Sequence, residues 1–152
     1  MPAPFRFDRR FEFAVAAPEL WATVEQTDRY PEWFPWLRHL DGAALQEGSV
    51  AQCVIQGPIP YSLHLSVHIE QVMPGERIAT RVRGDLEGPA SLDVEPDGSR
   101  STARLRWELE PHDRLLRSMA TLARPAMVWA HDRVIEVGLR EFERRALDGR
   151  GA

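Results

Sequence analysis

The chain has 152 residues and a net charge of −4, which is the length of one domain with an ordinary polar surface. This charge balance lacks the basic excess that phosphate-backbone binding requires, so no nucleic-acid partner is expected. The single cysteine, Cys53, excludes an internal disulfide and favours a reducing compartment. We therefore predict one domain over residues 1–152.

The start of the chain carries neither a basic segment followed by an apolar core nor any other long apolar run. These features predict a cytoplasmic protein without stable membrane insertion. All basic side chains except histidine are arginines, because the sequence contains no lysine. Schiff-base chemistry and a lysine nucleophile are thereby excluded.

The first predicted element is a half-buried strand over residues 5–15, in which apolar side chains alternate with polar ones. Arg9 falls on the apolar side of this alternation, where an unpaired charge would be costly. It either binds an acidic group of a ligand or lies at a bulge or at the rim of the sheet. The rim position is favoured, since arginine is rarely fully buried.

Two short helical segments follow. In the first, Pro18 stands at the opening helical position, where its missing N–H costs nothing. The second segment is broken by prolines and concentrates aromatic side chains at Trp33, Phe34 and Trp36. These rings either gate the mouth of a binding site or plug the end of the sheet as core.

Six further strands are predicted between Gly- and Pro-containing turns. They span residues 37–43, 49–57, 61–73, 76–84, 86–95 and 101–111. Alternation places Ile69, Thr80 and Trp107 on one shared apolar face, and His64 and His68 on the opposite, solvated face. Consecutive hairpins of this kind predict an antiparallel sheet with one apolar side.

A long C-terminal helix is predicted from an N-cap at Asp113 to about Leu147, with a kink or restart at Pro125. His131 lies at the centre of its apolar stripe, and Gly138 leaves a gap beside it that would suit a cavity. Trp129 falls on the polar side of the helix. It marks either a homodimer contact or a change of register at the proline.

Other chemistries leave little trace in the sequence. His64 and His68 are four residues apart, but on a strand and not on a helix. No pair of histidines has the spacing of metal ligands together with an acidic or cysteine side chain on the same face. No glycine-rich phosphate loop precedes a helix, and no serine lies in a nucleophile elbow. We therefore expect no metal, no cofactor and no covalent catalysis.

The order of strand, two short helices, six strands and a long helix resembles the START-like helix-grip superfamily, in its polyketide cyclase/dehydrase-like branch. Three segments carry the resemblance, namely residues 13–21, residues 28–33 and residues 129–134. It implies an α+β helix-grip fold, in which a curved antiparallel sheet of about seven strands wraps around the C-terminal helix. It also implies a deep apolar cavity between sheet and helix.

Three functions are compatible with this pattern. The leading hypothesis is a protein that binds or transports a hydrophobic or amphipathic small molecule, such as a lipid or a polyketide-like compound. The second is a cyclase, aromatase or dehydratase with His131 as acid/base and Tyr61, Thr80 or Arg9 as orienting donors. The third is a regulatory module that binds a protein partner through Trp129 and the helix surface.

His131 itself has two interpretations, a ligand-orienting or acid/base group and a core histidine satisfied by one backbone carbonyl. The predicted ligand-binding residues share apolar or inward-facing positions. They are Trp33, Phe34, Trp36, Tyr61, Val67, Thr80, Leu92, Trp107, Met127, His131, Ile135 and Gly138.

Overall fold

A computed structural model describes residues 5–42, 45–56, 62–112, 114, 117–118 and 124–147. Its strands are β1 (Phe5–Phe13), β2 (Leu37–Asp41), β3 (Val50–Gln56), β4 (Ser62–Met73), β5 (Arg77–Gly84), β6 (Leu86–Asp97) and β7 (Arg100–Pro111). Its helices are α1 (Ala17–Val24), a 3₁₀ turn at Thr27–Arg29, α2 (Tyr30–Trp33) and α4 (Arg124–Phe142), which continues as a π-helical turn over Glu143–Leu147.

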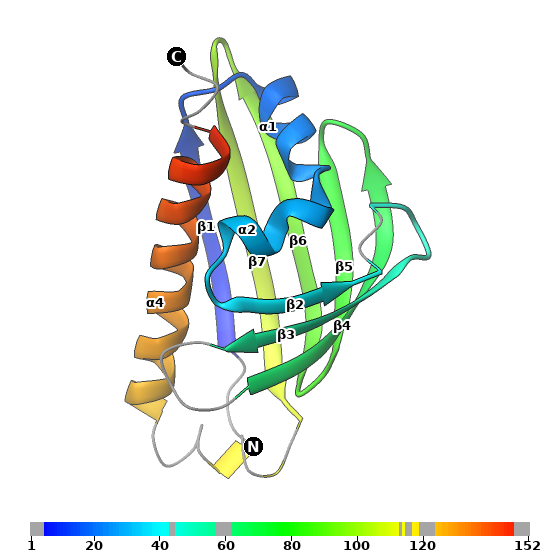
Figure 1. The fold of residues 1–152 in the computed structure, drawn as a ribbon, viewed down its shortest axis with the longest axis vertical. Helices are drawn as coiled ribbons and strands as arrows, with labels where there is room; N and C mark the ends of the chain where they lie inside the picture. Colours follow the sequence, from blue (N-terminus) through cyan, green and yellow to red (C-terminus); the bar gives the residue numbers. More distant parts are fainter. Residues whose placement is uncertain are drawn as a thin grey trace.

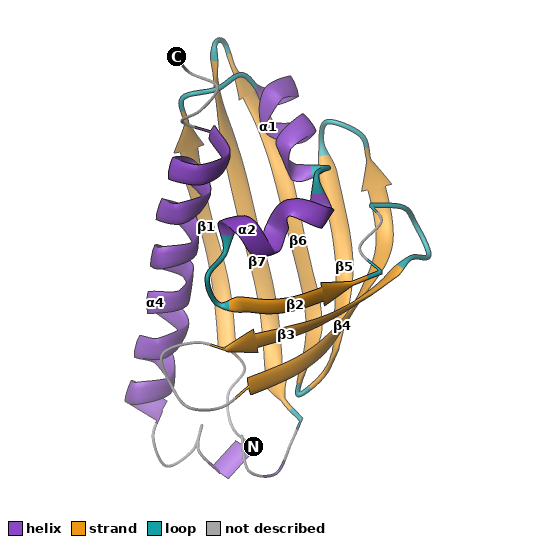
Figure 2. Cartoon of the chain, in the orientation of Figure 1, coloured by secondary structure: helices purple, strands orange, loops and turns teal. Residues whose placement is uncertain are grey.

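The seven strands form one antiparallel sheet in the order β1-β7-β6-β5-β4-β3-β2. The sheet curls strongly, so that β2 and β3 cross in front of β7 and β6, while α4 runs alongside β1 (Figure 1). Helices α1 and α2 cover the upper part of the inner face (Figure 2). The predicted helix-grip fold is therefore confirmed.

Local sequence accounts for the curl. The register shifts between Ile69 and Gln71 in β4 and between Leu37 and His39 in β2, and such bulges bend a strand and increase its twist. Gly88, inside β6, has a φ of 147° and lies so close to the backbone of β7 that a Cβ would collide with the carbonyl oxygen of Glu108. Only glycine permits this close approach of two strands.

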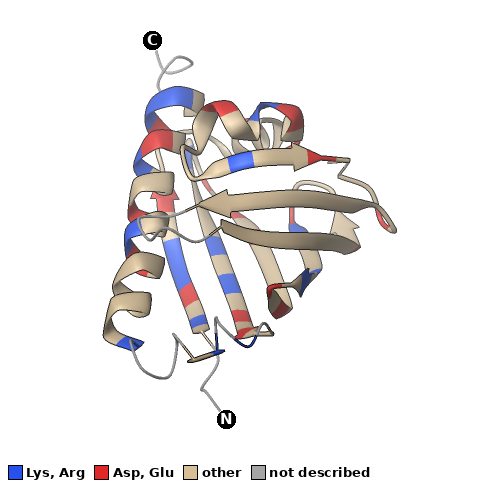
Figure 3. Ribbon diagram, turned by 60° about the horizontal axis from the view of Figure 1, so that its bottom comes forward, with Lys and Arg blue, Asp and Glu red and all other residues tan. Residues whose placement is uncertain are grey.

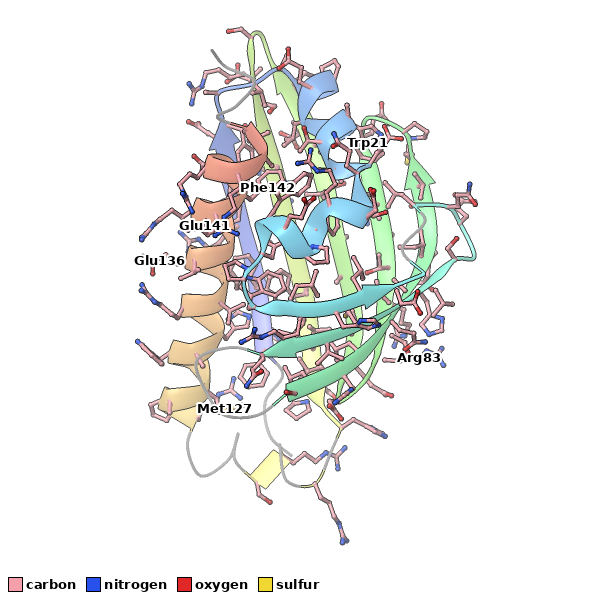
Figure 4. All side chains as sticks on the ribbon, viewed as in Figure 1. Trp21, Arg83, Met127, Glu136, Glu141 and Phe142 are labelled. Carbon is pink, nitrogen blue, oxygen red and sulfur yellow. The ribbon has the colours of Figure 1, made fainter. Side chains whose placement is uncertain are left out.

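Helix α4 presents one apolar side to the sheet. Met127 and Phe142 are buried on that side, whereas Glu136 points away from it (Figure 4). Pro125 is the second residue of α4 as described, and the segment 119–123 and the expected N-cap Asp113 lie outside the described residues, so the kink or restart at Pro125 stays a prediction. Trp129 is 58% exposed and therefore lies on the polar side of α4, as predicted.

The outer face of the sheet carries paired charges. Arg104 of β7 makes a two-pronged contact with Asp8 of β1, and Asp93 of β6 accepts hydrogen bonds from Arg77 and Arg106. Charged residues lie along β1, β7 and α4, whereas β3 contains no charged residue (Figure 3). The apolar residues are thereby left for the concave side, where the core and the cavity lie.

Candidate ligand-binding cavity

An apolar cavity in two compartments lies between the concave face of the sheet and α4. We name them from the orientation of Figure 4, in which Phe142 lies near the top of α4 and Met127 near its lower end. The upper compartment has a volume of about 300 Å³ and the lower compartment about 330 Å³. Trp36, Trp107 and Ile135 line both, so these three side chains form the partition between them.

The upper compartment is built by the first helices together with the central strands. Leu20 and Val24 are one turn apart on α1, a spacing that turns both side chains toward the sheet. The remaining lining comes from β1, from the aromatic segment after α1, and from β6, β7 and α4. These residues are Phe11, Phe13, Tyr30, Phe34, Leu92, Val94, Ala103, Leu105, Gly138, Leu139 and Phe142.

The lower compartment is built by the curled half of the sheet and the first turns of α4. Alternation along β3, β4 and β5 turns every second side chain inward, as at Cys53, Val67 and Val82. The other lining residues are Phe5, Ile55, Leu63, Leu65, Leu86, Ala90, Leu109, Met127, Ala130, His131 and Val134.

Neither compartment has an Asp, Glu or Arg in its lining among the described residues. The titratable groups there are Tyr30, Cys53 and His131. The Tyr30 hydroxyl donates to the carbonyl oxygen of Val24, and burial raises the pKa of Tyr30 above its usual range. Burial also raises the pKa of the Cys53 thiol to about 11, so this side chain acts as a small apolar group at neutral pH.

His131 has both ring nitrogens engaged. The indole N–H of Trp107 donates to Nε2 at 3.0 Å, which fixes the proton on Nδ1, 3.2 Å from the Asp132 carboxylate. The ring stacks on Phe5, with 6.0 Å between centroids, and 22% of the side chain is exposed. Accepting a proton at Nε2 would break the bond from Trp107. His131 therefore acts in this structure as a fixed acceptor in the wall.

Trp36 is held from three sides. Its carbonyl oxygen accepts a hydrogen bond from the Gln56 backbone at 2.8 Å, and its ring lies 5.0 Å from that of Phe34. A Cβ at Gly138 would lie 2.6 Å from the Trp36 indole nitrogen. The gap predicted at Gly138 is thus occupied by the edge of the Trp36 ring. This contact explains the glycine in mid-helix, which costs about 1 kcal/mol relative to alanine.

Most of the residues predicted to bind ligand lie in these walls. Those that line a compartment are Phe34, Trp36, Val67, Leu92, Trp107, Met127, His131, Ile135 and Gly138. Whether they contact a ligand stays a prediction.

Two of the predicted residues that the structure describes, Trp33 and Thr80, do not line the compartments. Trp33 is 1% exposed and packs in the core, with its ring 5.7 Å from those of Tyr30 and Phe142, so it plugs the end of the sheet. Thr80 does not line either compartment, because its hydroxyl donates to the carbonyl oxygen of Ala90 at 2.8 Å. Tyr61 lies outside the described residues.

Arg9 lies at the rim of the sheet. It is exposed in a groove between β1 and α4 that Asp132, Glu136 and Arg140 also line, and its guanidinium carbon lies 5.5 Å from the centre of the Phe11 ring.

Three residues that line the upper compartment, Leu20, Val24 and Phe13, were not predicted as ligand-binding residues from the sequence. The apolar i, i+4 spacing in α1 and the alternation in β1 were the available signals.

No cluster of three metal-ligating side chains occurs within the described ranges. None of the described helices is both long enough and apolar enough to cross a membrane.

A curled seven-stranded sheet that grips a long C-terminal helix is the START-like fold. The chain belongs to the family "Polyketide cyclase / dehydrase and lipid transport", because the model of that family matches residues 4–146. No curated protein matches the sequence.

Several solved structures share the fold at low sequence identity. A protein of Thermus thermophilus is 11% identical with a TM-score of 0.76, over 96% of this chain and 99% of that one. The Zhui aromatase/cyclase of a Streptomyces species is 13% identical with a TM-score of 0.67, over 95% and 98% of the two chains. A START superfamily protein of Mycobacterium smegmatis is 15% identical with a TM-score of 0.62, over 87% and 98%.

Proposed function

We propose that this protein binds an uncharged or weakly polar hydrophobic small molecule in the cavity between the sheet and α4. One observation carries the proposal: two adjoining compartments of about 300 and 330 Å³ have walls without a charged side chain among the described residues. Each compartment reaches the lower end of the volume range of small-molecule sites, roughly 300–1,000 Å³. Transfer of an apolar ligand from water into such walls is favourable by about 25 cal/mol per Å² of apolar surface.

The family description supports the same role, since it includes lipid transport as well as cyclase and dehydrase members. The fold excludes neither carrier nor enzyme, because one fold supports many functions. The walls favour a carrier or sensor, since they offer shape and apolar surface but few polar groups that converge on one point.

The first test is native mass spectrometry of freshly purified protein, followed by extraction of any bound compound. Binding of the apolar fluorophore diphenylhexatriene provides a second readout. Ala103→Leu narrows the upper compartment and Ala130→Leu the lower one, while Ala126→Leu adds the same carbon atoms at an exposed position of α4. We expect at least one of the two narrowing variants to weaken binding and the control to retain it. Wild-type protein that carries no adduct and does not bind the fluorophore would contradict the proposal.

Cyclase, aromatase or dehydratase chemistry is the second candidate, because His131 lies in the wall of the lower compartment. In such a reaction Nε2 would have to exchange the Trp107 indole for the substrate. Turnover of a poly-β-keto thioester that is lost in His131→Ala, with fluorophore binding retained, would support this role. Equal turnover in both proteins would remove it.

A further inference from the structure

One wall of the upper compartment also faces the solvent. Phe11 of β1, with Ile135 and Leu139 of α4, lines this compartment, and the same three residues line the open groove between β1 and α4. All three are partly exposed, as expected for side chains with the compartment on one side and water on the other. Ile135 and Leu139 are one turn apart on the same face of α4. The groove and the compartment thus share a wall made of these side chains.

The boundary between β1 and α4 is held by side chains. β1 is the terminal strand of the described sheet, so on the side of α4 it has no hydrogen-bonded partner strand (Figure 1). No hydrogen bond or ion pair joins the described residues of β1 to residues 132–142 of α4. Ring contacts close the two ends of the boundary, since Phe5 lies 6.0 Å from His131 and Phe13 lies 5.8 Å from Phe142. The shared wall lies between these two contacts.

Arg9 leaves the middle of this boundary without an apolar side chain. It lies opposite Leu105 in the pairing of β1 with β7, and Leu105 lines the upper compartment, so both side chains leave the sheet on its concave side. Arg9 is nevertheless exposed in the groove, with its guanidinium carbon 5.5 Å from the centre of the Phe11 ring. Its side chain therefore turns outward over the edge of β1 and keeps its charged end in water.

We propose that hydrophobic ligands enter and leave the upper compartment between β1 and α4, through an opening that we call the portal. The side chains of the portal are Arg9, Phe11, Ile135 and Leu139. This inference rests on the proposed function and adds the path of exchange. Opening the portal requires rotamer changes of partly exposed side chains, which are fast. A path through the sheet would instead break the backbone hydrogen bonds between two strands.

A matched pair of variants tests the portal. Leu139 and Leu105 both line the upper compartment, but only Leu139 also lines the groove. Leu139→Ala and Leu105→Ala remove the same atoms, so each enlarges the compartment. Association and dissociation of diphenylhexatriene are followed by stopped-flow fluorescence. We expect both rate constants to be at least about fivefold higher in Leu139→Ala than in Leu105→Ala, with affinities that agree within about twofold.

A reversible bridge tests the portal without removing core atoms. Arg9 and Glu136 are exposed and line the groove from its two sides, β1 and α4. In a Cys53→Ala background, Arg9→Cys and Glu136→Cys are joined by dithiobismaleimidoethane, which a reductant cleaves. We expect both rate constants to fall at least about fivefold in the bridged protein and to recover after reduction.

Either of two results would overturn the inference and leave the proposed function intact. The first is equal rate constants in folded Leu139→Ala and Leu105→Ala. The second is a bridged protein that exchanges the fluorophore as fast as the reduced one, and this result decides alone if Leu139→Ala does not fold. If the wild type does not bind the fluorophore and carries no adduct, the proposed function fails and this inference fails with it.

Discussion

Replacing Ala130 by leucine tests directly whether the lower compartment is empty space. Ala130 is 5% exposed on α4 and lines that compartment, so the three added carbon atoms would enter the cavity. At about 0.8 kcal/mol per buried carbon, the gain is at most about 2.4 kcal/mol. Ordering the leucine side chain costs about 0.5–1 kcal/mol, and helix propensities of Ala and Leu nearly coincide. We therefore expect Ala130→Leu to raise the free energy of unfolding by about 1.5 kcal/mol.

The assay is thermal unfolding followed by circular dichroism. For a chain of this length 1 kcal/mol corresponds to about 2–4 °C, so Tm should rise by about 3–6 °C. The control Ala126→Leu, one turn earlier and exposed, should shift the free energy of unfolding by less than about 0.5 kcal/mol. If the compartment were already filled by side chains, overpacking would instead cost about 1–3 kcal/mol. A fall in Tm for Ala130→Leu, with an unchanged control, would refute the reasoning.

Three further predictions concern the walls. Gly138→Ala should displace the Trp36 indole and weaken fluorophore binding. The free energy of unfolding should change little, because a steric cost of about 1–3 kcal/mol is opposed by a gain of about 1 kcal/mol in helix propensity. An unshifted Trp36 indole resonance in the ¹H–¹⁵N spectrum of the variant would contradict this prediction. Because burial raises the pKa of Cys53 to about 11, the protonated thiol contributes stability that is fully present below pH 9 and is lost as the pH rises toward 11. In urea titrations over this range, the free energy of unfolding should therefore fall less in Cys53→Ala than in the wild type. Equal falls in both proteins would count against this prediction. Trp107→Phe leaves His131 Nε2 without its donor and should lower the free energy of unfolding by about 1–3 kcal/mol. His131→Phe should lower the free energy of unfolding less in the Trp107→Phe background than in the wild type, because the hydrogen bond is already absent there. Equal losses in the two backgrounds would argue against coupling of the two residues.

Most of the fold could be predicted from the sequence because its signals are local. Alternation and turn residues place β4 and β7 within one residue of their observed starts, and Pro18 marks the start of α1. The first strand ends at Phe13, two residues before the predicted end, because the chain leaves the sheet to enter α1. Such boundaries depend on tertiary context, which a local pattern does not contain.

The cavity could be predicted only in part, because its walls are set by contacts between distant residues. Alternation assigns Thr80 an inward position, but it cannot reveal that the Thr80 hydroxyl donates a hydrogen bond to the carbonyl oxygen of Ala90. The aromatic segment looks uniform in sequence, but Trp33 packs in the core while Trp36, three positions later, reaches the cavity wall. The pairing of Trp36 with Gly138 spans most of the chain. Neither residue alone indicates the other.

The pairing of the first strand with the last has a consequence for biosynthesis. Arg6 lies opposite Glu108, 102 positions later, so β1 has no partner strand until β7 has been made. At about 5–20 residues per second, the ribosome needs roughly 5–20 s to reach that point. Throughout this interval the nascent chain exposes Phe5, Phe7 and Phe13, which are buried in the finished fold. The edge of β1 therefore lacks its native partner strand for most of translation, and an unpaired strand edge of this kind can pair wrongly with another chain.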